Sequence, residues 1–213
     1  MPIQAKICGI NTAESMKAAI DHGAAHVGLV FFPPSPRAVG IMQAASLAAP
    51  VPSHINIVGL FVNPSDDQIA QVLEAVPLDI IQLHGKETAQ RCAEIKARTG
   101  RQVMKAIGIQ NENDLADIGP HEAACDMLLF DAKAPKDAKL PGGNAVAFDW
   151  HVLAGRQWSK PWMLAGGLNV DNVPTAVKLT GATCVDTSSG VEDAPGLKSP
   201  TKIAAFLAKI KGL

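Results

Sequence analysis

Tyrosine is absent from this sequence, and aromatic residues make up only 4% of it. The 19 lysines and arginines nearly balance the 20 aspartates and glutamates, which leaves a formal net charge of -1 and no basic cluster. Proteins that bind nucleic acid need a patch or stripe of basic residues. We therefore expect no nucleic-acid partner and favour chemistry on a small molecule.

Long apolar runs are also missing. No stretch approaches the about 20 apolar residues needed to cross a bilayer. The N-terminal MPIQAKICGI lacks the charged start, apolar core and cleavage site of a signal peptide. These absences predict no membrane partner and a cytoplasmic location.

Cysteine is sparse and scattered. The four cysteines form no C-x-x-C pair and have no histidine at the spacing that zinc sites use; they are Cys8, Cys92, Cys125 and Cys184. Disulfide frameworks and structural zinc sites both depend on such spacing. We expect neither a disulfide framework nor a metal site.

Eight short apolar runs, each bounded by turn residues, are typical of strands. They cover residues 5–10, 26–32, 56–62, 79–85, 102–108, 127–132, 162–167 and 184–190. Helix-like segments with Ser, Thr, Asp or Asn near their starts follow most of them, at 12–23, 65–76, 87–100, 172–181 and 199–212, with weaker ones at 41–52 and 149–158.

Strict alternation of strand and helix predicts a parallel sheet. Within 213 residues we expect an α/β fold, a single (β/α)₈ TIM barrel that occupies residues 1–213 as one domain. A doubly wound open sheet is the alternative, but eight units would make a large sheet with exposed edges.

Polar residues recur near the ends of these strands. Side chains alternate along a strand, and barrel active sites lie at the C-terminal ends of the strands. Alternation therefore predicts which residues near these ends point toward the barrel axis, and we call these the rim positions. They are Lys6, Cys8, Gln82, His84, Lys105, Asp131, Asp186 and Ser188. Any one of them could be structural, as buried cysteines usually are, but their convergence favours a site in which His84 and Asp186 bind substrate.

Two glycine-rich segments, LAGGLN at 164–169 and DTSSGVE at 186–192, end the seventh and eighth predicted strands. Barrels often bind phosphate there through backbone N–H groups. One such segment could be a simple tight turn, but the pair favours a phosphorylated substrate.

Seven motifs in order resemble the phosphoribosylanthranilate isomerase family over essentially the whole chain. They are KICGI (6–10), FFPPSPRAV (31–39), VGLFVN (58–63), IQLHG (81–85), FDA (130–132), AGGL (165–168) and VDTSSGVE (185–192). The resemblance implies the Amadori rearrangement of N-(5-phosphoribosyl)anthranilate in tryptophan biosynthesis, without metal or organic cofactor. We expect a monomer or homodimer, since no motif distinguishes between the two.

The resemblance also implies residue roles. Cys8 corresponds to the family's general base, Asp131 to its general acid, and Arg37 to the residue that contacts the anthranilate moiety. The phosphate-binding site would comprise Gly166, Gly167, Ser188, Ser189 and Gly190. From the residues themselves we add the hypothesis that the ammonium of Lys6, two positions away on the same strand face, activates Cys8.

One departure and two rival functions accompany this interpretation. The family reads close to GGTG before its FDW motif, whereas Gly142–Ala145 reads GGNA here. A histidine-pathway isomerase would carry an aspartate in place of Cys8 and a second phosphate-binding site, and residues 1–106 contain no second SSG motif. A non-catalytic phosphate-binding barrel would not need both Cys8 and Asp131.

Overall fold

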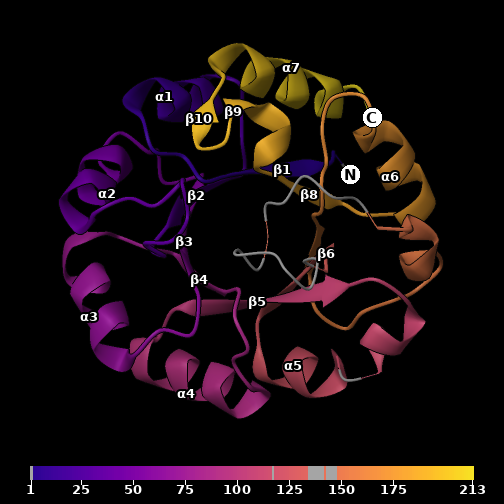
Figure 1. The fold of residues 1–213 in the computed structure, drawn as a ribbon, viewed down its shortest axis with the longest axis horizontal. Coiled ribbons are helices and arrows are strands. Elements are labelled where there is room, and N and C mark those ends of the chain that lie inside the picture. The colour runs from indigo at the N-terminus through magenta and orange to yellow at the C-terminus, as the bar shows by residue number, and fades with distance from the viewer. Residues whose placement is uncertain (1, 117, 134–141, 143–147) are drawn as a thin grey trace.

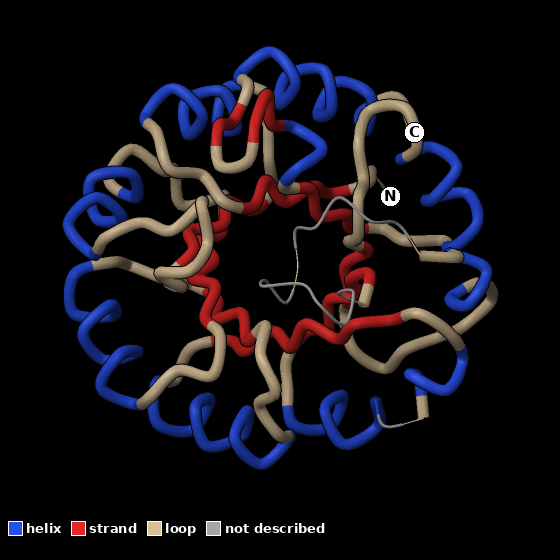
Figure 2. The backbone as a smooth tube through the Cα atoms, in the orientation of Figure 1, coloured by secondary structure: helices blue, strands red, loops and turns tan. Residues whose placement is uncertain are grey.

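In the computed structural model, eight parallel strands follow one another around a closed barrel, and β8 pairs with β1 to complete the ring (Figures 1 and 2). The structure describes residues 2–116, 118–133, 142 and 148–213. The barrel strands are β1 (Gln4–Cys8), β2 (His26–Val30), β3 (Asn56–Phe61), β4 (Ile80–Leu83), β5 (Gln102–Ile109), β6 (Met127–Ala132), β7 (Trp162–Leu164) and β8 (Cys184–Thr187).

The helices form an outer ring around the strands (Figure 2). They are α1 (Ala13–Asp21), α2 (Ile41–Ala48), α3 (Asp66–Ala75), α4 (Ala89–Thr99), α5 (Ile118–Ala124), α6 (Val173–Thr180) and α7 (Pro200–Lys211), with the 3₁₀ turns η1 (Glu112–Leu115), η2 (Trp150–Leu153) and η3 (Ser189–Val191). None of the helices in the described ranges is long and apolar enough to span a membrane.

Local sequence explains where several helices begin and end. The hydroxyls of Thr12, Ser65 and Thr88 each accept a hydrogen bond from a backbone N–H in the first turn of α1, α3 and α4. These side chains satisfy donors that have no partner within the helix. Gly100 and Gly181 end α4 and α6 in the left-handed conformation, which glycine adopts without a steric penalty.

The eight predicted strands are confirmed, but three details differ. The helix predicted over 149–158 is only the short 3₁₀ turn η2. Helix α5 was not predicted, and neither was the small antiparallel hairpin of β9 (Glu192–Ala194) and β10 (Leu197–Lys198). Each of these segments is too short to carry a clear hydrophobic period, so local pattern could not define it.

Alternation along the strands separates two apolar regions. The barrel interior contains Val58, Ile80, Met104, Ala106, Leu129, Met163, Ala165 and Cys184. The opposite strand faces pack against the helices in the larger core. Lys105 is therefore a correction to the predicted rim, because its neighbours Met104 and Ala106 face inward and its own ammonium lies outside the barrel beside Glu87.

Candidate active site

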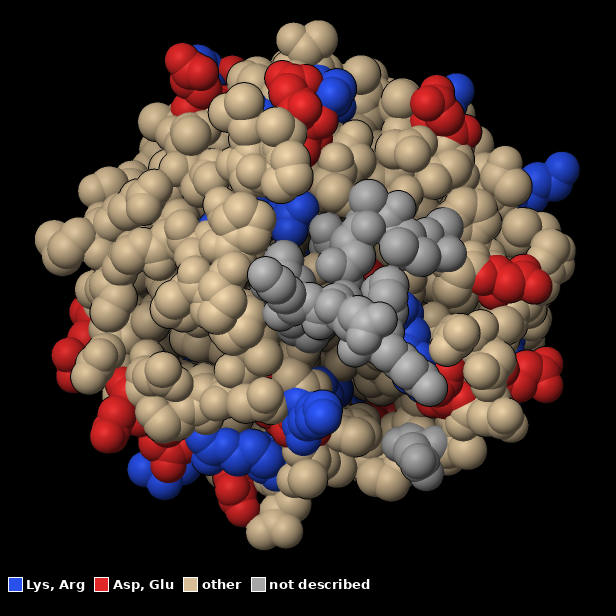
Figure 3. All heavy atoms as spheres, viewed as in Figure 1, with Lys and Arg blue, Asp and Glu red and all other residues tan. Residues whose placement is uncertain are grey.

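A pocket opens at the C-terminal ends of the strands and gathers most of the predicted site residues. Its lining includes ten of them: Cys8, Arg37, Gln82, His84, Asp131, Gly166, Gly167, Asp186, Ser188 and Ser189. Lys6 and Gly190 are not among the lining residues. In the view of Figure 3, Asp and Glu side chains lie mainly toward the periphery, whereas Lys and Arg side chains also appear near the centre.

Asp131 lies near the end of β6 and contacts a histidine that follows β4. One of its oxygens, Oδ2, lies 3.2 Å from Nε2 of His84, and the other accepts a hydrogen bond from the N–H of Ala132 at 2.8 Å. Nδ1 of His84 lies 3.2 Å from the amide nitrogen of Gln82. Asp131 is 6% exposed, so this carboxyl is reached through the pocket.

Gly142 approaches this pair closely. A Cβ atom at this position would lie 2.5 Å from Oδ2 of Asp131 and 2.6 Å from Nε2 of His84. Only a residue without a side chain allows that approach. Of the GGNA departure noted in the sequence, Gly143, Asn144 and Ala145 lie outside the described residues.

Cys8 ends β1 and is 4% exposed. Burial raises the pKa of its thiol above the ordinary value, the ammonium groups of Lys6 and Lys198 oppose this rise, and the Asp186 carboxylate adds to it. A Cβ on Gly28 of the neighbouring strand would lie 3.1 Å from the sulfur of Cys8. Glycine there leaves the space that the thiol occupies.

Lys6 is fully buried and forms an ion pair with Asp186, its register partner on β8, at 2.9 Å. Burial alone would lower the pKa of Lys6, but the charges of Asp186 and Cys8 raise it above its ordinary value. Lys6 therefore lies beneath the pocket as a permanent cation whose charge is shared between a carboxylate and the Cys8 sulfur.

Arg37 reaches the pocket from the loop after β2 and is clamped by the hairpin that follows β8. Its Nε and Nη2 donate to the two carboxylate oxygens of Glu192 at 2.7 and 2.9 Å. Lys198 donates to Oε1 of the same carboxylate and to the carbonyl and hydroxyl oxygens of Ser188. Two cations thus share one carboxylate.

The β7 and β8 ends bring the two glycine-rich segments together at the pocket. Gly166 and Gly167 have φ values of 90° and 64°, which lie in the region that favours glycine. Ser188 and Ser189 line the same side through the turn that enters η3. Gly190 instead packs against the backbone of Leu168, where a Cβ would overlap the carbonyl group.

Sequence reasoning did not single out Glu192 and Lys198. Glu192 closes the VDTSSGVE motif, so a charged residue directly after a predicted phosphate turn was an available signal. Its partner Arg37 is 155 positions away in the chain, however, and nothing local identifies that pairing. Within the described ranges, no group of three or more His, Cys, Asp or Glu side chains is placed to hold a metal ion.

Proteins similar to this chain in sequence include phosphoribosylanthranilate isomerases. The family model for N-(5'phosphoribosyl)anthranilate (PRA) isomerase matches residues 5–209. The N-(5'-phosphoribosyl)anthranilate isomerase of Paracoccus denitrificans is 56% identical over 209 residues, covering 98% of this chain and 97% of that protein.

Two solved structures share the fold over nearly the whole chain. The phosphoribosyl anthranilate isomerase from Thermotoga maritima has a TM-score of 0.89 and 34% identity, covering 99% of this chain and 100% of that one. A phosphoribosyl anthranilate isomerase in complex with reduced 1-(o-carboxyphenylamino)-1-deoxyribulose 5-phosphate has a TM-score of 0.84 and 32% identity, with the same coverage.

Proposed function

Because the chain belongs to the N-(5'-phosphoribosyl)anthranilate isomerase family, an isomerase family of tryptophan biosynthesis, we propose that it converts N-(5'-phosphoribosyl)anthranilate to 1-(2-carboxyphenylamino)-1-deoxyribulose 5-phosphate. In this proposal Asp131 is the general acid and Cys8 the general base. One observation carries these assignments: both side chains enter a single pocket, from β6 and β1, beside the glycine-rich turns of β7 and β8.

The first step opens the ribose ring. The protonated carboxyl of Asp131 donates its proton to the ring oxygen as the C1–O bond breaks, and the amine nitrogen lone pair forms the C1=N bond of a Schiff base. Only Oδ2 of Asp131 faces His84, because Oδ1 is held by the N–H of Ala132. That restraint keeps one oxygen available for proton transfer.

The second step removes the proton from C2. The Cys8 thiolate takes it, the C1=C2 bond forms, and the electrons of C1=N return to nitrogen, which gives an enolamine that tautomerises to the ketone. Thiolate is the basic form of cysteine, and a nearby ammonium favours it. Lys6 and Lys198 supply the positive charge in this proposal, since both act to lower the pKa of Cys8 against its burial.

The remaining pocket residues would bind the two ends of the substrate. Arg37, which Glu192 holds in place, would contact the substrate's anthranilate moiety. Backbone N–H groups around Gly166, Gly167, Ser188 and Ser189 would bind the phosphate.

The test is the loss of anthranilate fluorescence from enzymatically generated phosphoribosylanthranilate. Cys8→Ser and Asp131→Asn should each reduce turnover by roughly a hundredfold or more, whereas Asp21→Asn, at a surface ion pair of α1, should match the parent. A folded parent that only equals the uncatalysed decay would refute the activity. Normal turnover by either site variant would refute the role of that residue.

A further inference from the structure

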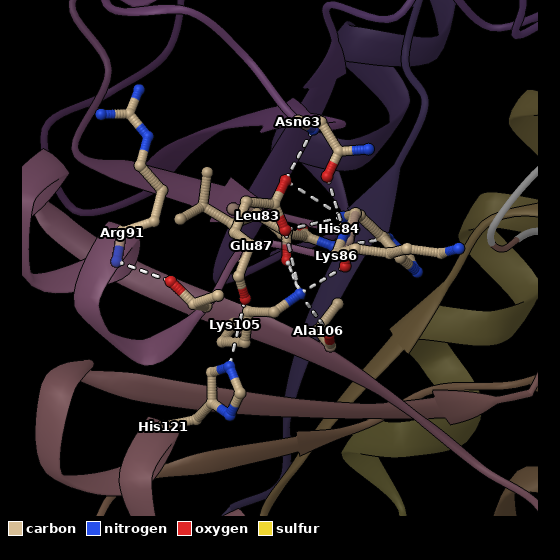
Figure 4. Close-up of polar contacts among 12 residues, drawn as sticks. Asn63, Leu83, His84, Lys86, Glu87, Arg91, Lys105, Ala106 and His121 are labelled. Carbon is tan, nitrogen blue, oxygen red and sulfur yellow. Dashed lines mark hydrogen bonds and ion pairs between the residues drawn. The ribbon is translucent and has the colours of Figure 1, made fainter.

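A buried ion pair lies outside the barrel, directly behind the turn that carries His84, and the reaction proposed above does not use it. Glu87 Oε2 and Lys105 Nζ are 3.0 Å apart, and their side chains are 2% and 5% exposed (Figure 4). Burying two charges is costly unless further hydrogen bonds satisfy them. The identity of those further partners indicates what the pair does.

The pair hydrogen-bonds to the backbone on both sides of His84. Lys105 donates to the carbonyl oxygens of Leu83 at 3.1 Å and Gly85 at 2.8 Å, the residues immediately before and after the histidine. Glu87 accepts the N–H of Gly85 at 2.9 Å. His84 is therefore the central residue of a turn whose flanking peptide groups are fixed by two buried charges.

Neighbouring elements lock the same turn. Glu87 also accepts the N–H of Asn63 at 2.7 Å, and the side-chain oxygen of Asn63 accepts the N–H of Lys86 at 2.7 Å. Asn63 has φ of 48°, the one non-glycine residue in the left-handed region within the described ranges. His121 of α5 contacts the carbonyl oxygen of Glu87 at 3.1 Å. The turn is thus held from the β3 loop, from β5 and from α5.

The imidazole of His84 is the group this turn presents to the pocket. Its Nε2 lies 3.2 Å from Oδ2 of Asp131 and its Nδ1 lies 3.2 Å from Nε2 of Gln82. A displacement of the turn would move His84 away from the carboxyl oxygen that the proposed function uses as a proton donor. Misplacements of about 1 Å cost enzymes up to roughly a hundredfold in rate.

We propose that Glu87 and Lys105 are positioning residues for His84, and that they act through His84 on the proton held by Asp131. This inference rests on the proposed function for its kinetic consequence. The geometry of the pair, the turn and the imidazole stands independently of it.

The experiment is a double-variant comparison. Glu87→Gln keeps the shape of the side chain and removes its charge, so we expect kcat to fall roughly tenfold or more with little change in KM, and the pH profile of kcat to shift. In a His84→Asn background the same substitution should change kcat less than about twofold, because residues that act through one another are non-additive.

Two further variants separate positioning from simple stability. Asp126→Asn removes another carboxylate that pairs with a lysine and accepts a strand N–H, from Val103, and should lower the melting temperature without shifting the pH profile. Asn63→Gly keeps the left-handed backbone and removes only the bond to Lys86, so it should loosen the turn without leaving a charge unpaired. We expect Asn63→Gly to lower kcat as well, but by less than Glu87→Gln does.

The ring resonances of His84, followed by NMR against pH, give a readout without turnover. They should titrate differently in the parent and in Glu87→Gln or Asn63→Gly. Unchanged His84 titration in both variants, or equal kinetic losses from Glu87→Gln in the parent and in the His84→Asn background, would overturn the positioning role. An inactive parent with altered His84 titration in the variants would instead refute the proposed function and leave the positioning role standing.

Discussion

The ammonium of Lys6 lies 2.9 Å from the carboxylate of Asp186, across the seam where β1 and β8 close the barrel. The same ammonium interacts with the sulfur of Cys8. Lys6 is therefore shared between the carboxylate of Asp186 and the Cys8 thiol, which becomes an anion when it loses its proton. If Lys6 activates Cys8, the pH at which Cys8 ionises should depend on Lys6.

Removing the Lys6 charge should make Cys8 harder to ionise. Burial and Asp186 both raise the pKa of Cys8, and Lys6 lowers it, so Lys6→Met should move the midpoint of iodoacetamide labelling at Cys8 to higher pH. Mass spectrometry can follow this single site. The double variant Lys6→Met with Asp186→Asn should bring the midpoint partly back, and Lys17→Met, on the surface of α1, serves as the control. Superimposable profiles for Lys6→Met and the parent would contradict the activation hypothesis.

Adding one methyl group at Gly142 should separate the acid from its histidine. The new Cβ would lie within 2.6 Å of both Asp131 and His84, so one of them must move. We expect Gly142→Ala to lower kcat by roughly ten- to a hundredfold with little change in melting temperature. Gly119→Ala, where the Cβ meets no atom within 4 Å, should keep parental turnover. Normal kcat in Gly142→Ala would show that the close contact is dispensable.

Glu192 should control the affinity for substrate more than the rate. Glu192→Gln weakens the clamp on Arg37, and hydrogen bonds to charged groups contribute about 1.5–3 kcal/mol, so KM should rise by roughly tenfold or more while kcat changes little. The neighbouring Asp193→Asn, which removes the charge of a surface carboxylate paired with Lys202, is the matched control. Equal KM values in Glu192→Gln and Asp193→Asn would rule out the clamp.

His26 should make the fold sensitive to acid. Burial, assisted by the charge of Lys6, lowers the pKa of His26 from 6.5 to about 4. Below pH 6.5 the unfolded chain takes up this proton first, so the free energy of unfolding should fall between pH 6.5 and 4, by about 3 kcal/mol in all. Well above pH 6.5 neither state is protonated there, and the contribution is constant.

Urea unfolding at pH 7, 5.5 and 4 measures this effect. His26→Gln should lose less stability than the parent on acidification, whereas His54→Gln, at an exposed position, should follow the parent. A parent and His26→Gln that lose stability in parallel would assign the acid sensitivity to other groups.

Much of the fold follows from local sequence. The eight barrel strands and five of the stronger helices lie where hydrophobic period and capping residues place them, because alternation and capping act over a few residues. The same alternation places Cys8, Asp131 and Asp186 toward the pocket. Alternation also predicts that Lys105 faces outward. Its neighbours Met104 and Ala106 both face the barrel interior, so Lys105, which lies between them, faces the opposite side.

The sequence by itself therefore determined the order of strands, the end of the barrel at which polar residues collect and the family to which the chain belongs. Only the tertiary structure decided which charges meet: Lys6 with Asp186, Arg37 with Glu192, and Lys105 with Glu87. The first two pairs join residues 180 and 155 positions apart. Such contacts form when closing the barrel brings distant strand ends and loops together, and no local period encodes which partner a buried charge will find.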